Sequence, residues 1–348
     1  MNEFNYNDYD RHVYETELRD FLPETFIDCH THVWKDSFPP YVKKKPTPPD
    51  PTKKPKWTAF IKTKGVEVEE VCDDYKVMFP KNKITPLVFG SCSRDIQMCN
   101  DYVGAECRRL GLPSLLRSDY AMTPDFLEEE MTRHGMLGLK PYLSNHPQYI
   151  PPSEVRIFDF LPHSHLEAAN KNGWIVMLHI PRAKRLRDAL NIAQIMEIEE
   201  KYPNLKLIVA HIGRAYSKED LGDAFDTLRN TKNLVFDFTA NMCDDAIRAC
   251  IEACGTKRLL FGSDLPIAFM RMYRIVLEDG TYCNVVPKGF YGDGSNVDGL
   301  IEEERDDITI MIYEQLRALK RVALDMHLSD SDIEDIMYNN SNRLIYGK

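Results

Sequence analysis

Five polar side chains in this sequence stand where apolar segments end. His30 and His32 close the first apolar run, and His179, His211 and Asp264 each close a later one. Residues two apart on a strand point the same way, so His30 and His32 would project together. Burying several imidazoles and a carboxylate without partners is costly, and a divalent metal would satisfy all five at once. Imidazole nitrogens with one carboxylate suit zinc, and also manganese or iron.

The elements that must position these side chains alternate along the chain. Short apolar runs predict strands at 26–33, 84–90, 116–122, 136–143, 174–180, 205–212, 234–239 and 258–263. Segments of helical period predict helices at 96–110, 124–134, 158–172, 183–202, 218–229 and 244–254, with two more at 308–326 and 331–346. Eight strands alternating with helices predict an α/β fold, a (β/α)8 TIM barrel in one domain over 1–348. Active sites of such barrels lie at the carboxyl ends of the strands.

Two segments depart from this repeat. Residues 35–64 are rich in proline and lysine, which excludes a regular helix or a central strand. Residues 267–307 follow the eighth strand and contain a glycine-rich stretch at 289–299. Both follow strand ends, so we expect two inserted loops that cap the barrel mouth. An alternative from another class is a non-catalytic barrel whose 35–64 segment docks a partner as polyproline.

A second His-x-His pair lies within a predicted helix. Residues two apart on a helix diverge by about 200°, so we expect His163 and His165 to be surface or packing residues. The alternation of the first strand makes further predictions. Cys29 should face the helices, and Asp28 should lie one layer below the histidines and orient one of them.

Lys140 lies within the fourth predicted strand. A lysine inside a barrel must be paired, neutral or chemically modified. Three roles remain open. It could bridge two metals as a carbamate, bind a substrate carboxylate, or pair with a buried acid such as Asp28 or Asp237.

Arginines follow the ends of three predicted strands, namely Arg182, Arg214, Arg271 and Arg274. A guanidinium binds a carboxylate through two parallel hydrogen bonds. Their gathering in loops of one face predicts a small, anionic substrate, bound in particular by Arg182, Arg214 and Arg271.

Composition narrows the class of protein. The chain has 348 residues, with 44 Lys and Arg against 54 Asp and Glu, and a net charge of −10. This acidic balance argues against nucleic-acid binding, and no apolar run approaches the roughly 20 residues that span a bilayer. The polar amino terminus lacks the apolar region of a secretory signal, and the 9 cysteines are odd in number and scattered. We therefore expect a cytoplasmic protein with reduced thiols, and a homo-oligomer is compatible with the sequence.

The combination of motifs resembles the amidohydrolase superfamily, in its amidohydrolase-related (amidohydrolase 2) branch. The motifs are Asp28-x-His-x-His32, Gly138-x-Lys140, His179, Ala210-His211-Ile-Gly213, Phe261-Gly-Ser-Asp264-x-Pro266 and Asn340-x-Asn342-x-x-x-Tyr346. The resemblance covers residues 26–346. It implies a metal-dependent barrel enzyme with the metal on His30, His32, His179 and Asp264, and with His211 beside it as a catalytic group.

The same branch contains hydrolases and non-oxidative decarboxylases similar to aminocarboxymuconate-semialdehyde decarboxylase, so two reactions fit. In hydrolysis, Asp264 accepts a proton from a metal-activated water, and the metal, His211 or both polarise the carbonyl. Asp264 or His211 then protonates the leaving group. In decarboxylation, Asp264 or His211 protonates the ring carbon that loses carbon dioxide. We favour hydrolysis, because Lys140 suits a hydrolytic or two-metal site.

Overall fold

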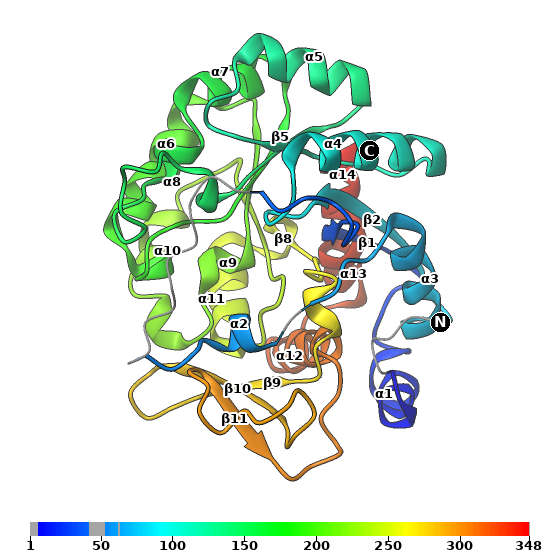
Figure 1. Ribbon diagram of the computed structural model, residues 1–348. Coiled ribbons are helices and arrows are strands. Elements are labelled where there is room, and N and C mark those ends of the chain that lie inside the picture. The colour runs from blue at the N-terminus through cyan, green and yellow to red at the C-terminus, as the bar shows by residue number, and fades with distance from the viewer. Residues whose placement is uncertain (1–5, 42–52, 62, 348) are drawn as a thin grey trace.

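The computed structural model describes residues 6–41, 53–61 and 63–347 (Figure 1), in which eight parallel strands pair into a closed barrel. The strands are β1 (Thr25–Val33), β2 (Lys83–Gly90), β3 (Leu116–Ser118), β4 (Gly138–Pro141), β5 (Ile175–Leu178), β6 (Lys206–Val209), β7 (Val235–Asp237) and β8 (Leu259–Leu260). β1 pairs with β2, and β3 to β8 pair in chain order. Parallel bridges Val88–Ser114 and Thr31–Leu265 join the two sheets at both edges. The predicted TIM barrel is confirmed.

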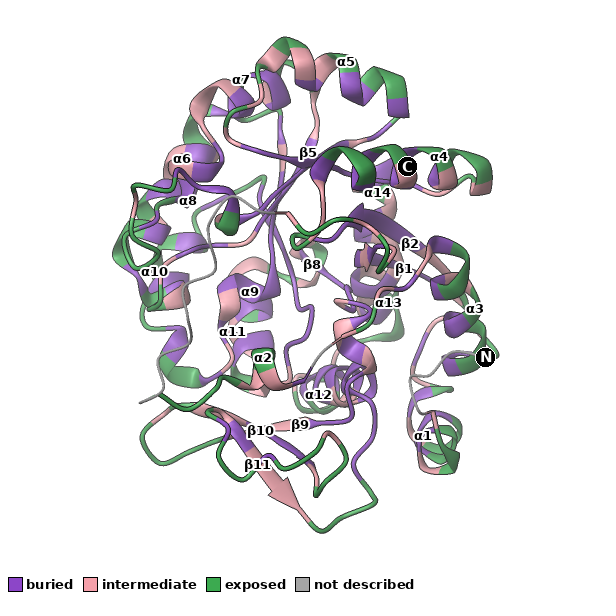
Figure 2. Ribbon diagram, viewed as in Figure 1, coloured by how far each residue is buried: buried purple, intermediate pink, exposed green. Residues whose placement is uncertain are grey.

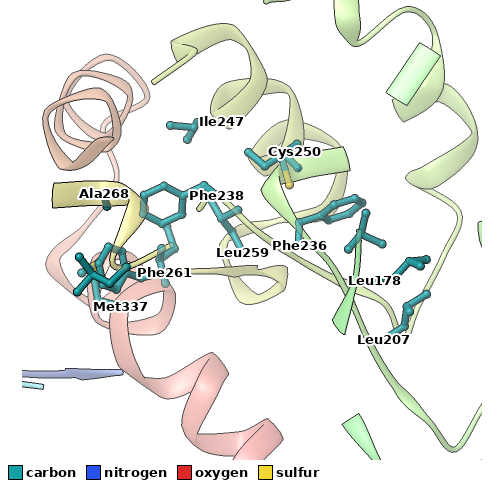
Figure 3. Packing of buried hydrophobic residues seen from close by; sticks show 14 of the residues in the cluster. Leu178, Leu207, Phe236, Phe238, Ile247, Cys250, Leu259, Phe261, Ala268 and Met337 are labelled. Atoms are coloured by element: carbon teal, nitrogen blue, oxygen red, sulfur yellow. The ribbon is translucent and has the colours of Figure 1, made fainter. Parts of the chain in front are cut away.

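The strands are buried on both faces, as their continuous apolar runs predict (Figure 2). One apolar set includes Leu178, Leu207, Phe236 and Leu259, which pack with Ile247 and Cys250 of a surrounding helix (Figure 3). A separate set includes Ile27, Met177, Ile208 and Leu260, and it fills the interior of the barrel. These two layers hold the strand ends in fixed positions.

Helices surround the barrel: α3 (Val68–Met78), α4 (Ile96–Leu110), α5 (Pro124–His134), α6 (Ile157–Phe160), α7 (His163–Asn172), α8 (Ala189–Lys201), α10 (Ala224–Leu228) and α11 (Asp244–Cys254). α4, α5 and α11 have the predicted bounds. The helix predicted at 158–172 is interrupted before Pro162, which is the N-cap of α7. α8 starts later than predicted, because Asp188 caps it by accepting hydrogen bonds from the amides of Leu190 and Asn191. α3 lies in a stretch for which the sequence predicts no helix.

The amino-terminal segment packs on α12 beside the barrel. α1 (Asp8–Val13) continues into a π-helical turn at Tyr14–Leu18, and α12 (Met311–Asp325) lies against this turn. Arg317 of α12 donates to Glu17 at 2.5 Å. α13 (Asp330–Glu334) and α14 (Asn340–Tyr346) follow, so the extra carboxyl-terminal helices are present as expected.

The segment 267–307 is more ordered than the predicted loop. It forms β9 (Tyr273–Val276), β10 (Tyr282–Pro287) and β11 (Leu300–Glu303), a three-stranded unit that we call the inserted sheet (Figure 1). The short helix α2 (Trp57–Phe60) of the Pro/Lys segment packs on its apolar side with Met272 and Val286. The two insertions therefore contact each other, while positions 42–52 and 62 of the Pro/Lys segment lie outside the described residues.

Within the described ranges, no helix combines the length and apolar character that crossing a membrane requires. All nine cysteines are free thiols, as expected for reduced cysteines.

Candidate active site

The backbone turns sharply after two of the strands that carry the site residues. His211 follows β6 with φ 59°, and Asp264 follows β8 with φ 70°. Three more residues after His211 also have positive φ, in the short turn α9 (His211–Arg214). Non-glycine residues seldom adopt this conformation, and it concentrates at functional sites. Here it turns both side chains toward β1 at the mouth of the barrel.

Four predicted residues converge at that mouth. Asp264 Oδ1 lies 2.9 Å from His32 Nε2 and 3.6 Å from His30 Nε2. His30, His211 and Asp264 each offer a ligand atom within 4.8 Å of the others. His179 joins them through its ring, whose centroid is 5.2 Å from that of His211. The structure therefore brings all five strand-end residues together.

The hydrogen bonds of two histidines direct their remaining nitrogens at Asp264. His30 Nδ1 lies 3.0 Å from Asp237 Oδ2 and donates its proton there, which leaves a lone pair on Nε2. The Tyr142 hydroxyl donates to the carbonyl of Gly90 at 2.8 Å, so its oxygen accepts from His32 Nδ1 at 3.0 Å. His32 Nε2 then also presents a lone pair to Asp264. Two imidazole lone pairs and a carboxylate oxygen face one another here, an arrangement that a cation between them would stabilise.

The protonation states fit a metal. Burial lowers the pKa of His30, His32 and His179 below that of a free imidazole, which keeps the rings neutral. A free aspartate carboxyl has a pKa of about 3.9, so Asp264 is ionised at neutral pH. Neutral imidazoles and an ionised carboxylate are the forms that bind divalent metals. His179 Nδ1 is buried and has no hydrogen-bond partner within the described ranges, so this donor set fits a metal.

A model of the amidohydrolase family matches residues 27–346. The chain belongs to the amidohydrolase family. A search of curated proteins returned no match. Three solved structures share the fold of this amidohydrolase over at least 92% of its length. One is a probable 2-pyrone-4,6-dicarboxylic acid hydrolase from Acinetobacter baumannii with citric acid bound, with TM-score 0.56, 14% identity and 98% of that chain covered.

The second structure is 2,6-dihydroxybenzoate decarboxylase in complex with 2,6-dihydroxybenzoate, with TM-score 0.53 and 12% identity over 93% of this chain and 98% of that one. The third is 4-oxalomesaconate hydratase from Rhodopseudomonas palustris, with TM-score 0.54 and 14% identity over 92% of this chain and 95% of that one. At these identities the similarity shows a shared barrel fold.

Asp237 performs the role that was predicted for Asp28. Asp237 is fully buried at the end of β7, and besides His30 it accepts from the amides of His211 at 2.7 Å and Thr239 at 3.1 Å. Asp28 instead accepts from the backbone amides of His30 and Ser263, both at 2.9 Å. Its contact with His30 is therefore to the backbone and not to the ring. Asp237 closes an apolar strand like the other site residues, and this signal could have identified it.

Cys29 does not face the helices as predicted. It packs with Ile27, Leu87 and Phe89 in the cluster between the strands. The reason is a register shift between Asp28 and Thr31 in the pairing of β1 with β2. An irregularity of this kind breaks the strict alternation of side chains along a strand. His30 and Cys29 can therefore both lie on the barrel side.

Gly262 allows the segment after β8 to pack closely against Thr239 and His30. A Cβ atom at this position would lie 2.2 Å from Thr239 Oγ1 and 2.7 Å from His30 Cβ. Both distances are far below van der Waals contact, so any larger residue would displace His30. This explains the glycine beside Asp264 in the Phe-Gly-Ser-Asp motif.

Lys140 of the amidohydrolase is 1% exposed, and its Nζ lies 3.4 Å from His30 Nε2. Burial lowers the pKa of Lys140 to about 8, against the opposing charges of Asp237 and Asp264. No carboxylate of the described residues forms a direct ion pair with it, so the predicted pairing with Asp28 or Asp237 is not seen. Its two other predicted roles both place it at the metal site.

The predicted arginines do not act alike. Arg182 contacts Asp188, with Nε 3.4 Å from Oδ2. Arg214 donates through Nη1 to three backbone carbonyls at 3.3 to 3.4 Å. Arg271 lies apart from the site. It is 4% exposed and donates to Asp10 at 2.6 Å, so a carboxylate of the chain itself binds its guanidinium, and the substrate role of Arg271 stays a prediction.

The second His-x-His pair has the predicted packing roles. His163 is partly exposed, and its Nδ1 lies 2.7 Å from the Tyr202 hydroxyl. His165 is buried, and its Nε2 donates to the carbonyl of Met122 at 2.7 Å. Both residues lie on α7, away from the strand ends.

Proposed function

We propose that this amidohydrolase is a metal-dependent hydrolase of a small substrate that carries a carboxylate. The observation that supports this best is the set of lone pairs on His30, His32 and Asp264 that face one another. His30, His32, His179 and Asp264 would hold the metal, with zinc favoured over manganese or iron. When bound, the metal would lower the pKa of a water molecule and polarise a substrate carbonyl.

Asp264 and His211 handle the protons in this proposal. Asp264 is ionised at any neutral pH and accepts the proton of the attacking water. His211 Nδ1 lies 3.0 Å from the carbonyl of Thr239, which fixes its proton on Nδ1 and leaves Nε2 unprotonated. Nε2 can therefore take over the proton that Asp264 accepted from the water and pass it to the leaving group, or Asp264 can deliver that proton itself.

The carboxylate on the substrate is inferred from the arginines of the mouth. Arg214 forms no ion pair with any described carboxylate, and it lies close enough to His179 to help lower the pKa of that ring, after burial. Two solved structures of the same fold are named for carboxylic acids, 2-pyrone-4,6-dicarboxylic acid and 2,6-dihydroxybenzoate. Both facts support an anionic substrate bound by Arg182 and Arg214.

Decarboxylation is the second candidate, because a decarboxylase is among the solved structures of this fold and the same site residues serve both reactions. The test incubates metal-loaded protein with lactones, esters, amides and aromatic acids and follows proton and carbon dioxide release. Hydrolysis predicts product without carbon dioxide. Carbon dioxide in step with substrate loss would replace the hydrolase by the decarboxylase. Turnover of no compound by metal-loaded protein would favour the non-catalytic barrel.

Metal stoichiometry tests the role of Lys140. One equivalent by elemental analysis would support a single-metal site in which Lys140 binds the substrate carboxylate. Two equivalents would support a carbamate on Lys140 that bridges them. Lys140→Met should then lower the stoichiometry from two to one, whereas Lys140→Met in a single-metal site should leave it at one.

A further inference from the structure

Arg274 brings a positive charge from the inserted sheet to the mouth of the barrel. Its guanidinium carbon lies 4.4 Å from the ring centroid of Tyr216, and this ring lies 6.4 Å from that of His211. Arg274 Nη1 also donates to the carbonyl of Ala240, just beyond β7. The inserted sheet therefore reaches the candidate active site through Arg274.

A cluster of two arginines and two tyrosines forms around this point. The rings of Tyr216 and Tyr282 meet edge to face at 5.2 Å. Arg185 lies 5.2 Å and 4.7 Å from these two rings, and Arg274 lies 4.4 Å and 5.1 Å from them. We call these four residues the Arg–Tyr cluster. Stacked tyrosines stabilise the cations but do not neutralise them.

The two arginines of the cluster differ in their counter-charges. Arg185 forms an ion pair with Asp220. Arg274 is half-buried, and its Nε donates to the side-chain oxygen of Asn284 at 3.0 Å. Nη2 of Arg274 has no hydrogen-bond partner, and no carboxylate pairs with Arg274, among residues 6–41, 53–61 and 63–347. A partly desolvated cation of this kind is costly unless an anion binds to it.

The other arginines of the mouth make the contrast sharper. Arg182 and Arg185 have carboxylate partners, and so does Arg271 at the edge of the barrel. In the described part of the loops after β5, β6 and β8, Arg214 and Arg274 are the two half-buried arginines without one. Arg214 places its positive charge near His179, and Arg274 places its positive charge near Tyr216, whose ring lies beside His211.

We propose that Arg274 is a specificity-determining residue that binds a carboxylate of the substrate, and that the substrate is a dicarboxylate held between Arg274 and Arg214. The Tyr216 hydroxyl has no hydrogen-bond partner in the described ranges and can donate to the same carboxylate. Burial raises the pKa of Tyr216 to about 12, so the proton needed for this bond is present at neutral pH. This inference rests on the proposed function, since it names the substrate class for that same site.

The test measures binding without turnover. Calorimetric titrations of metal-loaded protein use succinate, glutarate and adipate, each beside its monomethyl ester, which carries one charge fewer. We expect at least one dicarboxylate to bind about tenfold more tightly than its ester, because one charge-assisted contact is lost in the ester. Arg274→Met should reduce dicarboxylate affinity by about tenfold or more and leave the affinity for the ester nearly unchanged.

Arg305→Met is the matched control. Arg305 also stacks on a tyrosine of the inserted sheet, 5.5 Å from the Tyr273 ring, but it pairs with Asp307 at 2.7 Å and faces solvent. This variant should bind like the wild type. Equal dicarboxylate affinity in the wild type and Arg274→Met would overturn the inference. So would equal binding of a dicarboxylate and its ester by the wild type, a measurement that needs no variant.

The two proposals fail in different measurements. Metal content and turnover of the compound panel test the hydrolase, whereas the calorimetric series tests the role of Arg274. A metal-loaded enzyme that hydrolyses neutral esters and binds no dicarboxylate would refute the inference and keep the proposed function. Conversely, the wild-type protein could hold no metal and turn over no compound, yet bind dicarboxylates more tightly than Arg274→Met does. That result would refute the proposed function and keep the inference.

Discussion

At the scale of single residues, one hydrogen bond decides what His30 can do. Asp237 accepts from Nδ1 at 3.0 Å and thereby turns Nε2 toward Asp264. Carboxylates that hold a metal-binding histidine in this way set both its orientation and its basicity. Asp237 is therefore expected to control metal affinity without touching the metal.

Asp237→Asn tests that role. The amide keeps the volume but removes the charge that favours a proton on His30 Nδ1, so metal affinity should fall about 10- to 100-fold with the fold retained. Competition with a chelator of known affinity measures the change. Asp226→Asn, at an exposed position of α10, is the control and should leave affinity unchanged. Wild-type affinity in Asp237→Asn would show that another group orients His30.

Asp264→Asn tests the centre of the proposed site. This change removes the proton acceptor and a metal ligand, so turnover should fall to background, while the circular dichroism spectrum should stay that of the wild type. His163→Gln is the control, because His163 belongs to the His-x-His pair on α7 and should retain full activity. A near-normal rate in Asp264→Asn would refute its assigned role.

At the scale of elements, the segment after β8 is held to the amino-terminal helix by a buried ion pair. Arg271 donates to both carboxylate oxygens of Asp10, and their side chains are 5% and 0% exposed. The Asp10 carboxylate also accepts from Thr309 and from the amide of Ile310. This arrangement joins α1, the entry to the inserted sheet and the start of α12.

Arg271→Met should therefore destabilise the protein and not alter the chemistry of the site. Removing one partner of a buried ion pair leaves an uncompensated charge, at a cost of about 3–5 kcal/mol in the free energy of unfolding. Urea denaturation measures it. The double variant Asp10→Asn, Arg271→Met should recover part of the loss, because no buried charge remains. A loss below about 1 kcal/mol, as for an exposed pair, would contradict this account.

At the scale of the whole molecule, the proposed metal would join parts of the barrel that are far apart in the chain. Its proposed ligand His30 lies on the first strand, and its proposed ligands His179 and Asp264 follow the fifth and eighth strands. A ligand that binds only the folded state stabilises it by about 2.7 kcal/mol at a hundred times its dissociation constant. Metal binding should therefore raise the melting temperature of the barrel.

Removal of the metal tests this stabilisation. Dialysis against a chelator should lower the melting temperature, and adding zinc back should restore it, as followed by calorimetry. The Asp264→Asn variant should respond less, since one ligand is lost. The same melting temperature before and after verified metal removal would mean that the strand ends need no cation to stay together.

The barrel, and the meeting of five strand-end residues at its mouth, were predictable from the sequence alone. Apolar runs with a polar residue at the end predict both the strands and the residues that meet, because all strands of a parallel barrel end at one rim. His163 and His165 were separated from the site by the same argument, since a helix does not align residues two apart.

Only the tertiary structure decided which groups surround those five residues. The register shift in β1 placed Cys29 between the strands, and Asp237 took the position beside His30 that was expected for Asp28. Arg271 and Arg274 lie three residues apart, yet one pairs with Asp10 at the opposite end of the sequence and the other reaches the site from the inserted sheet. Such partners come from distant segments. The physical reason is that the free energy of a buried charge depends on which groups the fold brings around it, and spacing along the chain does not contain that information.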